Sequence, residues 1–280
     1  MSLKDEIHNK LRSLGASPKR SLGQNFLIDE NIVAKIIEAV QASEPSSLVE
    51  IGPGLGSLTE KLRKLSPPLQ LIELDRDFSR LWREEGLQLT EADALQVDWD
   101  SLDLAPNTLL VSNLPYQISS SIVIDRSLGP KAITTMVLMF QKEVAQRIVA
   151  GARTKDYGLL SVIAQLFWHV NLVCEAGPRC FWPAPQVASR VLVFSRRDEG
   201  PMAEGKDVLR FVKAAFSHRR KILWKNLSGE CSRFGVEMDL AQKIGLDQGL
   251  GPQVRAEELA PHQFWHLFAE LKRAGKRTEA

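Results

Sequence analysis

Leu48-Val-Glu-Ile-Gly-Pro-Gly-Leu-Gly56 is the stretch that decides the fold of this 280-residue chain. Apolar residues typical of a buried strand lead directly into three glycines at alternate positions, and a helical pattern over 58–64 follows. Glycines let the backbone approach a ligand closely, and the first turn of a helix offers unpaired N–H groups. A strand, a glycine-rich turn and a helix in this order are typical of nucleotide-type sites at the edge of an α/β sheet.

The alternation of strands and helices continues on both sides of this loop. We predict short apolar strands over 47–51, 69–74, 87–92, 108–111, 133–140, 166–174 and 190–194. Helical patterns accompany them over 30–41, 58–64, 78–84, 119–127 and 142–150. Near-continuous apolar strands separated by helices favour a parallel sheet that helices cover on both faces. The predicted fold class is therefore α/β.

The character of the chain changes after residue 195. Residues 196–205 are polar, contain Gly200-Pro201 and form the best candidate for a linker. The remainder shows helical patterns alone, over 208–215, 219–227 and 261–273. We predict an α/β domain over 29–195 and a small all-α domain over 196–280, with residues 1–28 as an amino-terminal arm.

Composition excludes several classes of protein. Hydrophobic residues make up 44% of the chain and charged residues 25%, as in ordinary soluble globular proteins. Charges occupy the first residues, where a signal peptide needs its apolar core, and no apolar run approaches the roughly 18 residues of a membrane-spanning helix. We therefore expect a cytoplasmic protein that does not enter the membrane.

Basic residues are concentrated in the last third of the chain. Residues 208–229 contain no acid and six basic residues, which are Arg210, Lys213, Arg219, Arg220, Lys221 and Lys225. A polyanionic partner requires such a concentration of positive charge, although a solvated helix face has the same composition.

The glycine loop and the strand ends after it indicate the class of ligand. A dinucleotide fingerprint requires glycine at position 57, where this chain has Ser57, and the spacing Gly-x-Gly-x-Gly after Glu50 suits an adenosyl amino acid better than a pyrophosphate. Glu73, at the end of the second strand, can accept hydrogen bonds from both hydroxyls of a ribose. Asp93, followed by Ala94 at the third strand end, can accept the amine of an adenine. Acids often cap the helix after a strand, but acids at three successive strand ends, Glu50, Glu73 and Asp93, are less easily explained in that way.

Asn113-Leu-Pro-Tyr116 follows the fourth strand and is the sharpest signal in the chain. The amine of adenine is a poor nucleophile because its lone pair is delocalised into the ring, so its methylation needs acceptors that hold both hydrogens. The amide oxygen of Asn113 and the carbonyl of Leu114 can be these acceptors, and Pro115 favours an extended backbone at Leu114. The Tyr116 ring offers a face on which a flipped base can stack, an interaction of about 1–3 kcal/mol. An isolated tetrapeptide of this kind is an ordinary turn, so its place behind the glycine loop carries the argument.

With these motifs in view, the chain resembles the ribosomal RNA adenine dimethyltransferase family of the small-subunit type. The resemblance covers residues 17–270 and includes, in the family's order, Ser21-Leu-Gly-Gln-Asn-Phe-Leu27, Glu50–Gly56, Glu73, Asp93, Asn113–Tyr116, Phe181-Trp-Pro-Ala-Pro-Gln-Val-Ala-Ser189, Phe216-Ser-His-Arg-Arg-Lys221 and Arg255-Ala-Glu-Glu-Leu259. The chain departs from the family's pattern outside Asn113–Tyr116, at Trp182, Ala184, Gln186 and His218.

The resemblance implies a Rossmann-like methyltransferase that binds S-adenosyl-L-methionine, with residues 1–28 as an arm that closes over this cofactor. It implies cofactor contacts at Asn25, the main chain of Leu27, Gly52, Gly54, Glu73, Asp93, Ala94 and Asn113. It places Phe181 beside the target base, opposite Tyr116, and RNA contacts on Arg219, Arg220, Lys221 and Lys225. Members dimethylate the N6 amines of two adjacent adenosines near the 3′ end of small-subunit (16S) ribosomal RNA during ribosome biogenesis. A pre-assembled 30S particle as substrate and a monomeric enzyme without a metal are the corresponding expectations.

Other functions stay open. Large-subunit adenine methyltransferases that confer antibiotic resistance share the chemistry, although the basic carboxyl-terminal domain and the 181–189 segment favour the small-subunit type. A DNA adenine methyltransferase, a non-catalytic assembly or transcription factor of the same fold, and a dehydrogenase are further alternatives. The lack of a separate sequence-reading domain disfavours the DNA methyltransferase. The intact cofactor loop and 113–116 motif disfavour the non-catalytic factor, and Ser57 disfavours the dehydrogenase. His262 and His266 have a spacing that suits zinc, but neither an adjacent Glu nor a third ligand accompanies them.

Overall fold

The computed structural model describes residues 2–19 and 22–278, so Ser21 of the amino-terminal motif lies outside the described residues. By its packing the chain divides into a first unit of residues 1–145 and 169–196 and a second unit of residues 146–168 and 197–280. The boundary predicted after residue 195 leaves residues 146–168 in the α/β domain, whereas they pack with the helices that follow residue 197.

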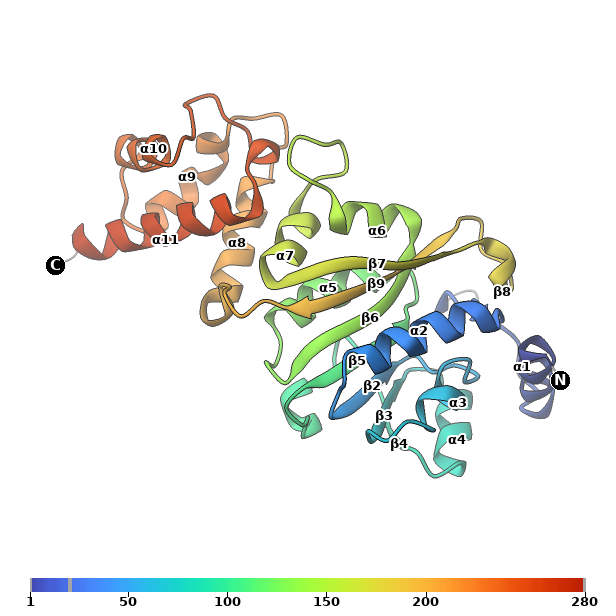
Figure 1. The fold of residues 1–280 in the computed structure, drawn as a ribbon. Coiled ribbons are helices and arrows are strands. Elements are labelled where there is room, and N and C mark those ends of the chain that lie inside the picture. The colour runs from blue at the N-terminus through green and yellow to red at the C-terminus, as the bar shows by residue number, and fades with distance from the viewer. Residues whose placement is uncertain (1, 20–21, 279–280) are drawn as a thin grey trace. The chain divides into compact units, whose positions relative to one another are not determined.

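A seven-stranded sheet forms the centre of the first unit, in the order β4-β3-β2-β5-β6-β9-β7 (Figure 1). Its strands are β2 (Ser47–Ile51), β3 (Leu69–Glu73), β4 (Gln88–Glu91), β5 (Thr108–Asn113), β6 (Ile133–Gln141), β7 (Trp168–Ala176) and β9 (Ser189–Arg196). The strands from β4 to β6 are parallel to one another, and β9 runs antiparallel to β6. A second, small sheet pairs β1 (Phe26–Leu27) with β8 (Phe181–Trp182) in antiparallel fashion.

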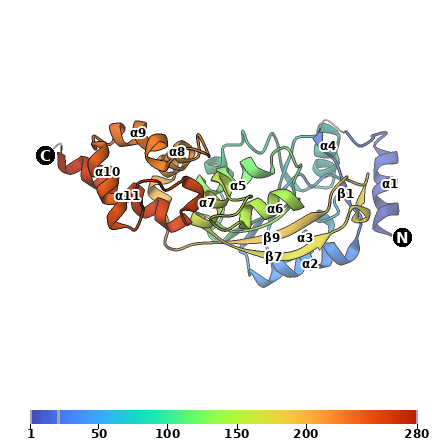
Figure 2. The ribbon, with the colours of Figure 1, turned by 90° about the horizontal axis from the view of Figure 1, so that it is seen from above.

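Helices cover this sheet on both faces. They are α2 (Glu30–Ala42), α3 (Thr59–Leu62), α4 (Arg76–Glu84), α5 (Ser119–Leu128) and the first turn of α6 (Lys142–Val149), whereas α1 (Leu3–Ser13) lies beyond the end of the sheet (Figure 1). Figures 1 and 2 show α2 and α5 on opposite faces of the sheet. Nearly every side chain of β2, β5 and β6 is buried, as expected for central strands covered on both sides. The predicted α/β class is confirmed.

The order of the strands reverses at β2, and this reversal places the site. From β2 the chain adds β3 and β4 on one side, and then β5 and β6 on the other. In the parallel register Glu50 lies opposite Leu71 of β3 and Val111 of β5, so the three strands end at one edge. Ligands of open α/β sheets bind beyond the carboxyl ends of the strands at such a reversal. Gly52, Glu73 and Asn113 lie at this edge.

The second unit is built from helices. They are the last turn of α6 and then α7 (Leu159–Phe167), α8 (Gly205–Ala215), α9 (Leu223–Arg233), α10 (Met238–Asp247) and α11 (Pro261–Thr278). Aromatic rings fill its core: Phe268 packs with its ring centroid 5.6 Å from that of Phe211 and 5.7 Å from that of Phe234. The buried Tyr157 hydroxyl donates to the carbonyl of Leu259 at 2.6 Å. In the described parts of both units, no helix has the length and apolar character needed to cross a membrane.

Several predicted elements differ from the structure in their bounds, and the starts of two of them have a clear cause. The strand predicted over 166–174 begins at Trp168, because the apolar run before it forms α7, whose start is capped when the Gly158 N–H donates to the Ser161 hydroxyl at 3.1 Å. An apolar run of this length suits a buried helix and a buried strand equally. The helix predicted over 219–227 begins at Leu223, where the first buried side chains of α9 appear.

Candidate functional site

The glycine loop after β2 is held rigidly by its neighbours. The Gly54 N–H donates to Glu73 Oε2 at 3.1 Å, and the Gly54 carbonyl accepts from Nε1 of the fully buried Trp82 at 2.9 Å. Gly56 has φ +93°, and a Cβ at this position would lie 2.5 Å from the Trp82 ring. Only glycine fits there without displacing the ring. These contacts therefore hold the glycine loop in its conformation at the base of the pocket without a ligand.

Glu73 stands at the end of β3, on the rim of the pocket that the glycine loop borders. Its Oε1 accepts from the Asp75 N–H at 2.8 Å, while Oε2 accepts from Gly54. Burial raises the pKa of Glu73, and the hydrogen bonds from the N–H groups of Asp75 and Gly54 act against this rise. Each carboxylate oxygen has a second lone pair, so both oxygens can still accept a hydroxyl from a ligand.

Glu50 is a site residue to which the sequence analysis assigned no role. It lines the same pocket and is 2% exposed, and its Oε2 is buried without a hydrogen-bond partner among the described residues. Burial raises the pKa of Glu50 to about 8, with the Thr59 hydroxyl acting in the opposite direction and the charge of Glu73 adding to the rise. A buried carboxyl group with one oxygen lacking a partner, at the edge of a pocket, is suited to a cationic ligand group. Its position directly before the glycines was the signal in the sequence.

Asn113-Leu-Pro-Tyr116 forms the opposite wall. The Asn113 Nδ2 group donates to the carbonyl of Asn25 at 3.0 Å, and no described residue donates to the carbonyl of Leu114. The Tyr116 hydroxyl lies 3.2 Å from Ser189 Oγ at the start of β9, and burial raises the pKa of Tyr116. The motif thus presents a half-buried aromatic ring and two backbone-anchored acceptors to the pocket.

Residues 22–27 of the amino-terminal arm complete the pocket. β1 of this arm lies beside β8, with Leu27 opposite Phe181, and the Leu27 carbonyl accepts from Ser57 Oγ at 2.6 Å. The ring of Phe26 approaches Gly54 so closely that a Cβ there would lie 3.3 Å from it. The arm is therefore packed against the glycine loop as well as against Asn113.

Most of the predicted site residues come together in this pocket. The lining includes Asn25, Leu27, Gly52, Gly54, Glu73, Asn113, Leu114, Pro115 and Tyr116. The space between these residues is about 760 Å³ when the solvent-filled mouth of the pocket is included. Leu74, which follows Glu73, also lines it and is 51% exposed, an apolar surface at the rim.

Three predicted residues do not line the pocket. Asp93 accepts the Leu95 N–H at 2.9 Å and so caps its own turn, and the carbonyl of Ala94 accepts from Trp99 Nε1 at 3.2 Å. Phe181 is 3% exposed within the β1–β8 pair and belongs to the hydrophobic core. Their roles toward a cofactor and a base stay predictions.

The predicted RNA-binding residues belong to the second unit. Arg219 is engaged by the protein itself: its Nε donates to Glu257 at 2.6 Å, and its Nη2 donates to the carbonyls of Thr154 and Lys155 at 3.3 and 2.9 Å. Arg220, Lys221 and Lys225 are exposed and form no ion pair with another described residue. Within the described ranges, no group of three or more His, Cys, Asp or Glu side chains is placed to hold a metal ion.

Comparison with known proteins gives a consistent result. Residues 15–273 match the family model described as ribosomal RNA adenine dimethylase. The chain is 48% identical, over 95% of its length and 96% of the relative's, to "Ribosomal RNA small subunit methyltransferase A" of Bdellovibrio bacteriovorus. It is 39% identical, over 89% of its length and 95% of the relative's, to the protein of the same name from Syntrophotalea carbinolica.

Solved structures share the fold. A dimethyladenosine transferase from Plasmodium falciparum superimposes with a TM-score of 0.74 at 24% identity, covering 89% of this chain and 98% of that one. The 23S rRNA methyltransferase ErmE gives a TM-score of 0.65 at 25% identity, covering 88% of this chain and 99% of that one. The predicted Rossmann-like methyltransferase fold is thereby confirmed.

Proposed function

The chain belongs to the ribosomal RNA adenine dimethylase family, and from this premise we propose that it dimethylates the N6 amines of two adjacent adenosines near the 3′ end of small-subunit (16S) rRNA, using S-adenosyl-L-methionine. The observation that carries the chemistry is the orientation of Asn113 in a pocket that also holds a glycine loop and two buried carboxylates. The names of the relatives at 48% and 39% identity support the small-subunit rRNA as substrate.

The pocket fits the three recognisable groups of this cofactor. Glu50, a buried carboxylate with an oxygen lacking a partner, would hold the ammonium group, and Glu73 would accept the two ribose hydroxyls. The exposed Leu74 would pack against the adenine, whose amine we assign to Asp93. The backbone of Gly52 and Gly54 would support the amino acid end. When bound, the cofactor supplies an electrophilic methyl group on a sulfonium.

Asn113 acts as a hydrogen-bond acceptor toward the target amine. The carbonyl of Asn25 can only accept, so the part of the Asn113 amide that faces it is the NH₂ group. The Asn113 Oδ1 atom is then left for a hydrogen of the adenine amine, and the Leu114 carbonyl can accept the other hydrogen. With both hydrogens held, the nitrogen lone pair is directed at the methyl group. Positioning of this kind can supply about 7–11 kcal/mol of a barrier without a general base.

Tyr116 provides the face on which the flipped adenine stacks. Its hydrogen-bonding distance to Ser189 restricts rotation of the ring, so the stacking surface is present before the base arrives. Phe181, across the strand pair from Leu27, is the proposed wall on the other side of the base. For the RNA backbone we propose Arg220, Lys221 and Lys225, with Arg219 as a structural support for the segment that leads into α9.

The substrate and the form of the enzyme complete the proposal. We propose that the RNA is methylated within a pre-assembled 30S particle and that the enzyme acts as a monomer without a metal. The likeness to ErmE makes large-subunit RNA the one serious alternative, since the pocket alone does not distinguish the two RNAs.

Transfer of radiolabel from S-adenosylmethionine to immature small subunits, large subunits and protein-free RNA tests this function. Label in N6,N6-dimethyladenosine from small subunits is the expected result. Asn113→Ala should abolish transfer while cofactor affinity changes little, and Asn171→Ala, at an exposed asparagine of β7, is the matched control. Label only in large-subunit RNA would contradict the proposed substrate, and cofactor binding without any transfer would indicate an assembly factor.

A further inference from the structure

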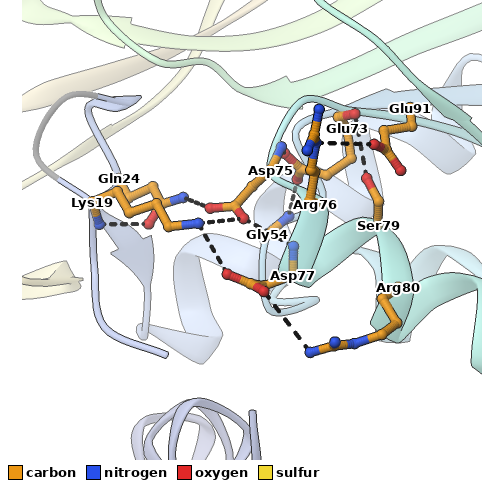
Figure 3. A network of polar contacts seen from close by, with 10 residues as sticks. All are labelled: Lys19, Gln24, Gly54, Glu73, Asp75, Arg76, Asp77, Ser79, Arg80 and Glu91. Atoms are coloured by element: carbon orange, nitrogen blue, oxygen red, sulfur yellow. Dashed lines mark hydrogen bonds and ion pairs between the residues drawn. The ribbon is translucent and has the colours of Figure 1, made fainter. Parts of the chain in front are cut away.

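A network of polar contacts outside the predicted site fastens the arm to the start of α4 (Figure 3). The Asp75 carboxylate accepts three hydrogen bonds, and two of them come from residues more than fifty positions earlier in the chain. Lys19 Nζ donates to Oδ1 at 2.7 Å and Gln24 Nε2 donates to Oδ2 at 2.8 Å. The third comes from the Asp77 N–H at 3.1 Å. Figure 3 shows Lys19 and Gln24 reaching Asp75 from the same side.

These contacts give the Asp75 carboxylate more hydrogen bonds than a residue that only caps a helix receives. The Asp75 side chain is 0% exposed, and although burial raises its pKa, the hydrogen bonds from Lys19 and Gln24 lower the pKa of Asp75 overall. Gln24 is itself fixed at both ends, because its Oε1 accepts the Lys19 N–H at 2.8 Å. Lys19 also reaches Asp77 Oδ2 at 3.0 Å. Charge-assisted hydrogen bonds at a buried carboxylate are the stronger kind.

The backbone of Asp75 connects this attachment to the pocket. Its N–H donates to Glu73 Oε1, and Glu73 Oε2 accepts from Gly54 of the glycine loop. Gln24 adjoins Asn25, whose carbonyl orients the Asn113 amide. Asp75 thus binds the arm through its side chain and binds the carboxylate of Glu73, the proposed ribose ligand, through its backbone N–H.

We propose that Asp75 is a positioning residue that clamps Lys19 and Gln24 at the cofactor pocket, so that cofactor affinity depends on Asp75 and Lys19, two side chains that do not line the pocket themselves. This inference rests on the proposed function, because it concerns the same cofactor. A simpler role, capping of α4, accounts for the Asp77 hydrogen bond alone and leaves the contacts with Lys19 and Gln24 unexplained.

Asp75→Asn separates the clamp from the cap. Asparagine caps a helix about as well as aspartate, so α4 keeps its start. The substitution removes the negative charge that pairs with Lys19. It also places the new NH₂ group opposite the NH₂ group of Gln24, so that two donors face each other. Because hydrogen bonds to charged groups are the stronger kind, we expect the Kd and KM for S-adenosylmethionine to rise about tenfold or more. The KM for RNA should stay at its wild-type value.

Lys19→Met tests the other end of the clamp and leaves the buried carboxylate and the cap in place. It should weaken cofactor binding by a smaller factor, about threefold to tenfold. The double variant should bind no more weakly than Asp75→Asn alone, because both changes break the same contact. Amide hydrogen exchange at residues 22–27 should accelerate in each variant.

The control is Asp98→Asn, the same substitution at a capping aspartate that forms no hydrogen bond or ion pair with the described residues of the arm. Isothermal titration calorimetry with S-adenosylmethionine compares the Kd of the wild type, Asp75→Asn, Lys19→Met, the double variant and Asp98→Asn. Wild-type affinity in both Asp75→Asn and Lys19→Met overturns the clamp, as does additivity in the double variant. Failure of the wild-type chain to bind S-adenosylmethionine refutes the proposed function instead.

Discussion

Glu50→Gln tests the charge state on which cofactor binding depends. Because burial raises the pKa of Glu50 to about 8, this carboxyl group is protonated in the free protein at pH 7. An ammonium group placed beside it favours the ionised form, so binding of the cofactor should expel the proton. A group with a pKa one unit above the solution pH is about nine-tenths protonated, which predicts release of up to about 0.9 proton per bound cofactor.

Calorimetric titrations at pH 7 in buffers of different ionisation enthalpy measure this release from the slope of the apparent binding enthalpy. The α-amine of the cofactor titrates in the same range and takes up a small fraction of a proton, but it does so equally in wild type and variant. Glu50→Gln should lose nearly the whole release and bind more weakly. Glu38→Gln, at an exposed position of α2, should behave as wild type.

Equal proton release by wild-type protein and Glu50→Gln would refute the reasoning. The proton would then come from another group, and Glu73 is the next candidate because burial raises its pKa as well. Loss of affinity without loss of proton release would show that Glu50 contacts the cofactor as an already ionised group. The two readouts together therefore separate the contact from its protonation.

Three further outcomes follow from the structure. The raised pKa of Glu50 means that the ligand-free fold holds a proton on this group more tightly than the unfolded chain does. The contribution of this proton to the free energy of unfolding is therefore complete below pH 4.5 and is lost as the pH rises towards 8, by up to about 1.4 kcal/mol per pH unit. Urea unfolding of Glu50→Gln should accordingly show a stability that depends less on pH. Gly56→Ala should lower the free energy of unfolding by about 1–3 kcal/mol because its Cβ would overlap a buried indole at a positive φ, whereas Gly251→Ala, in open space, should leave it unchanged. Lys221→Ala should reduce the slope of log K for RNA against log salt by about 0.7–0.9, whereas Arg219→Ala should chiefly lower thermal stability; an unchanged slope for Lys221→Ala would remove that residue from the RNA footprint.

Strands and strand ends were predictable because their cause is local. The prediction of 47–51 agrees with β2 residue for residue, because this short, mostly apolar stretch ends directly at the glycine-rich turn. The strand-end rule then located Glu73 and Asn113 at one edge, where the structure has them. Periodicity failed where an apolar run satisfied helix and strand equally, as at Leu166, which ends up in α7.

Features that depend on distant contacts were out of reach of the sequence. The clamp joins Lys19 to a carboxylate 56 residues later, and neither residue has a spacing or composition that indicates the other. The burial of Phe181 depends on the pairing of two-residue strands, which is too short to leave a pattern. That Oε2 of Glu50 has no hydrogen-bond partner in the described part of the chain is likewise a property of packing, although the place of Glu50 before the glycine loop was visible in the sequence.

The arm links cofactor binding to the chemistry because it serves both. An asparagine whose amide was oriented by its own strand would present the same acceptor with or without a cofactor. Here the Asn113 NH₂ group depends on the carbonyl of Asn25, and the arm that carries Asn25 is fastened through Gln24 to Asp75. Asp75 in turn holds the carboxylate of Glu73. The proposed acceptor for the target amine and the proposed ligand for the ribose therefore lie at the two ends of one short chain of contacts, so a loosened arm should disturb both.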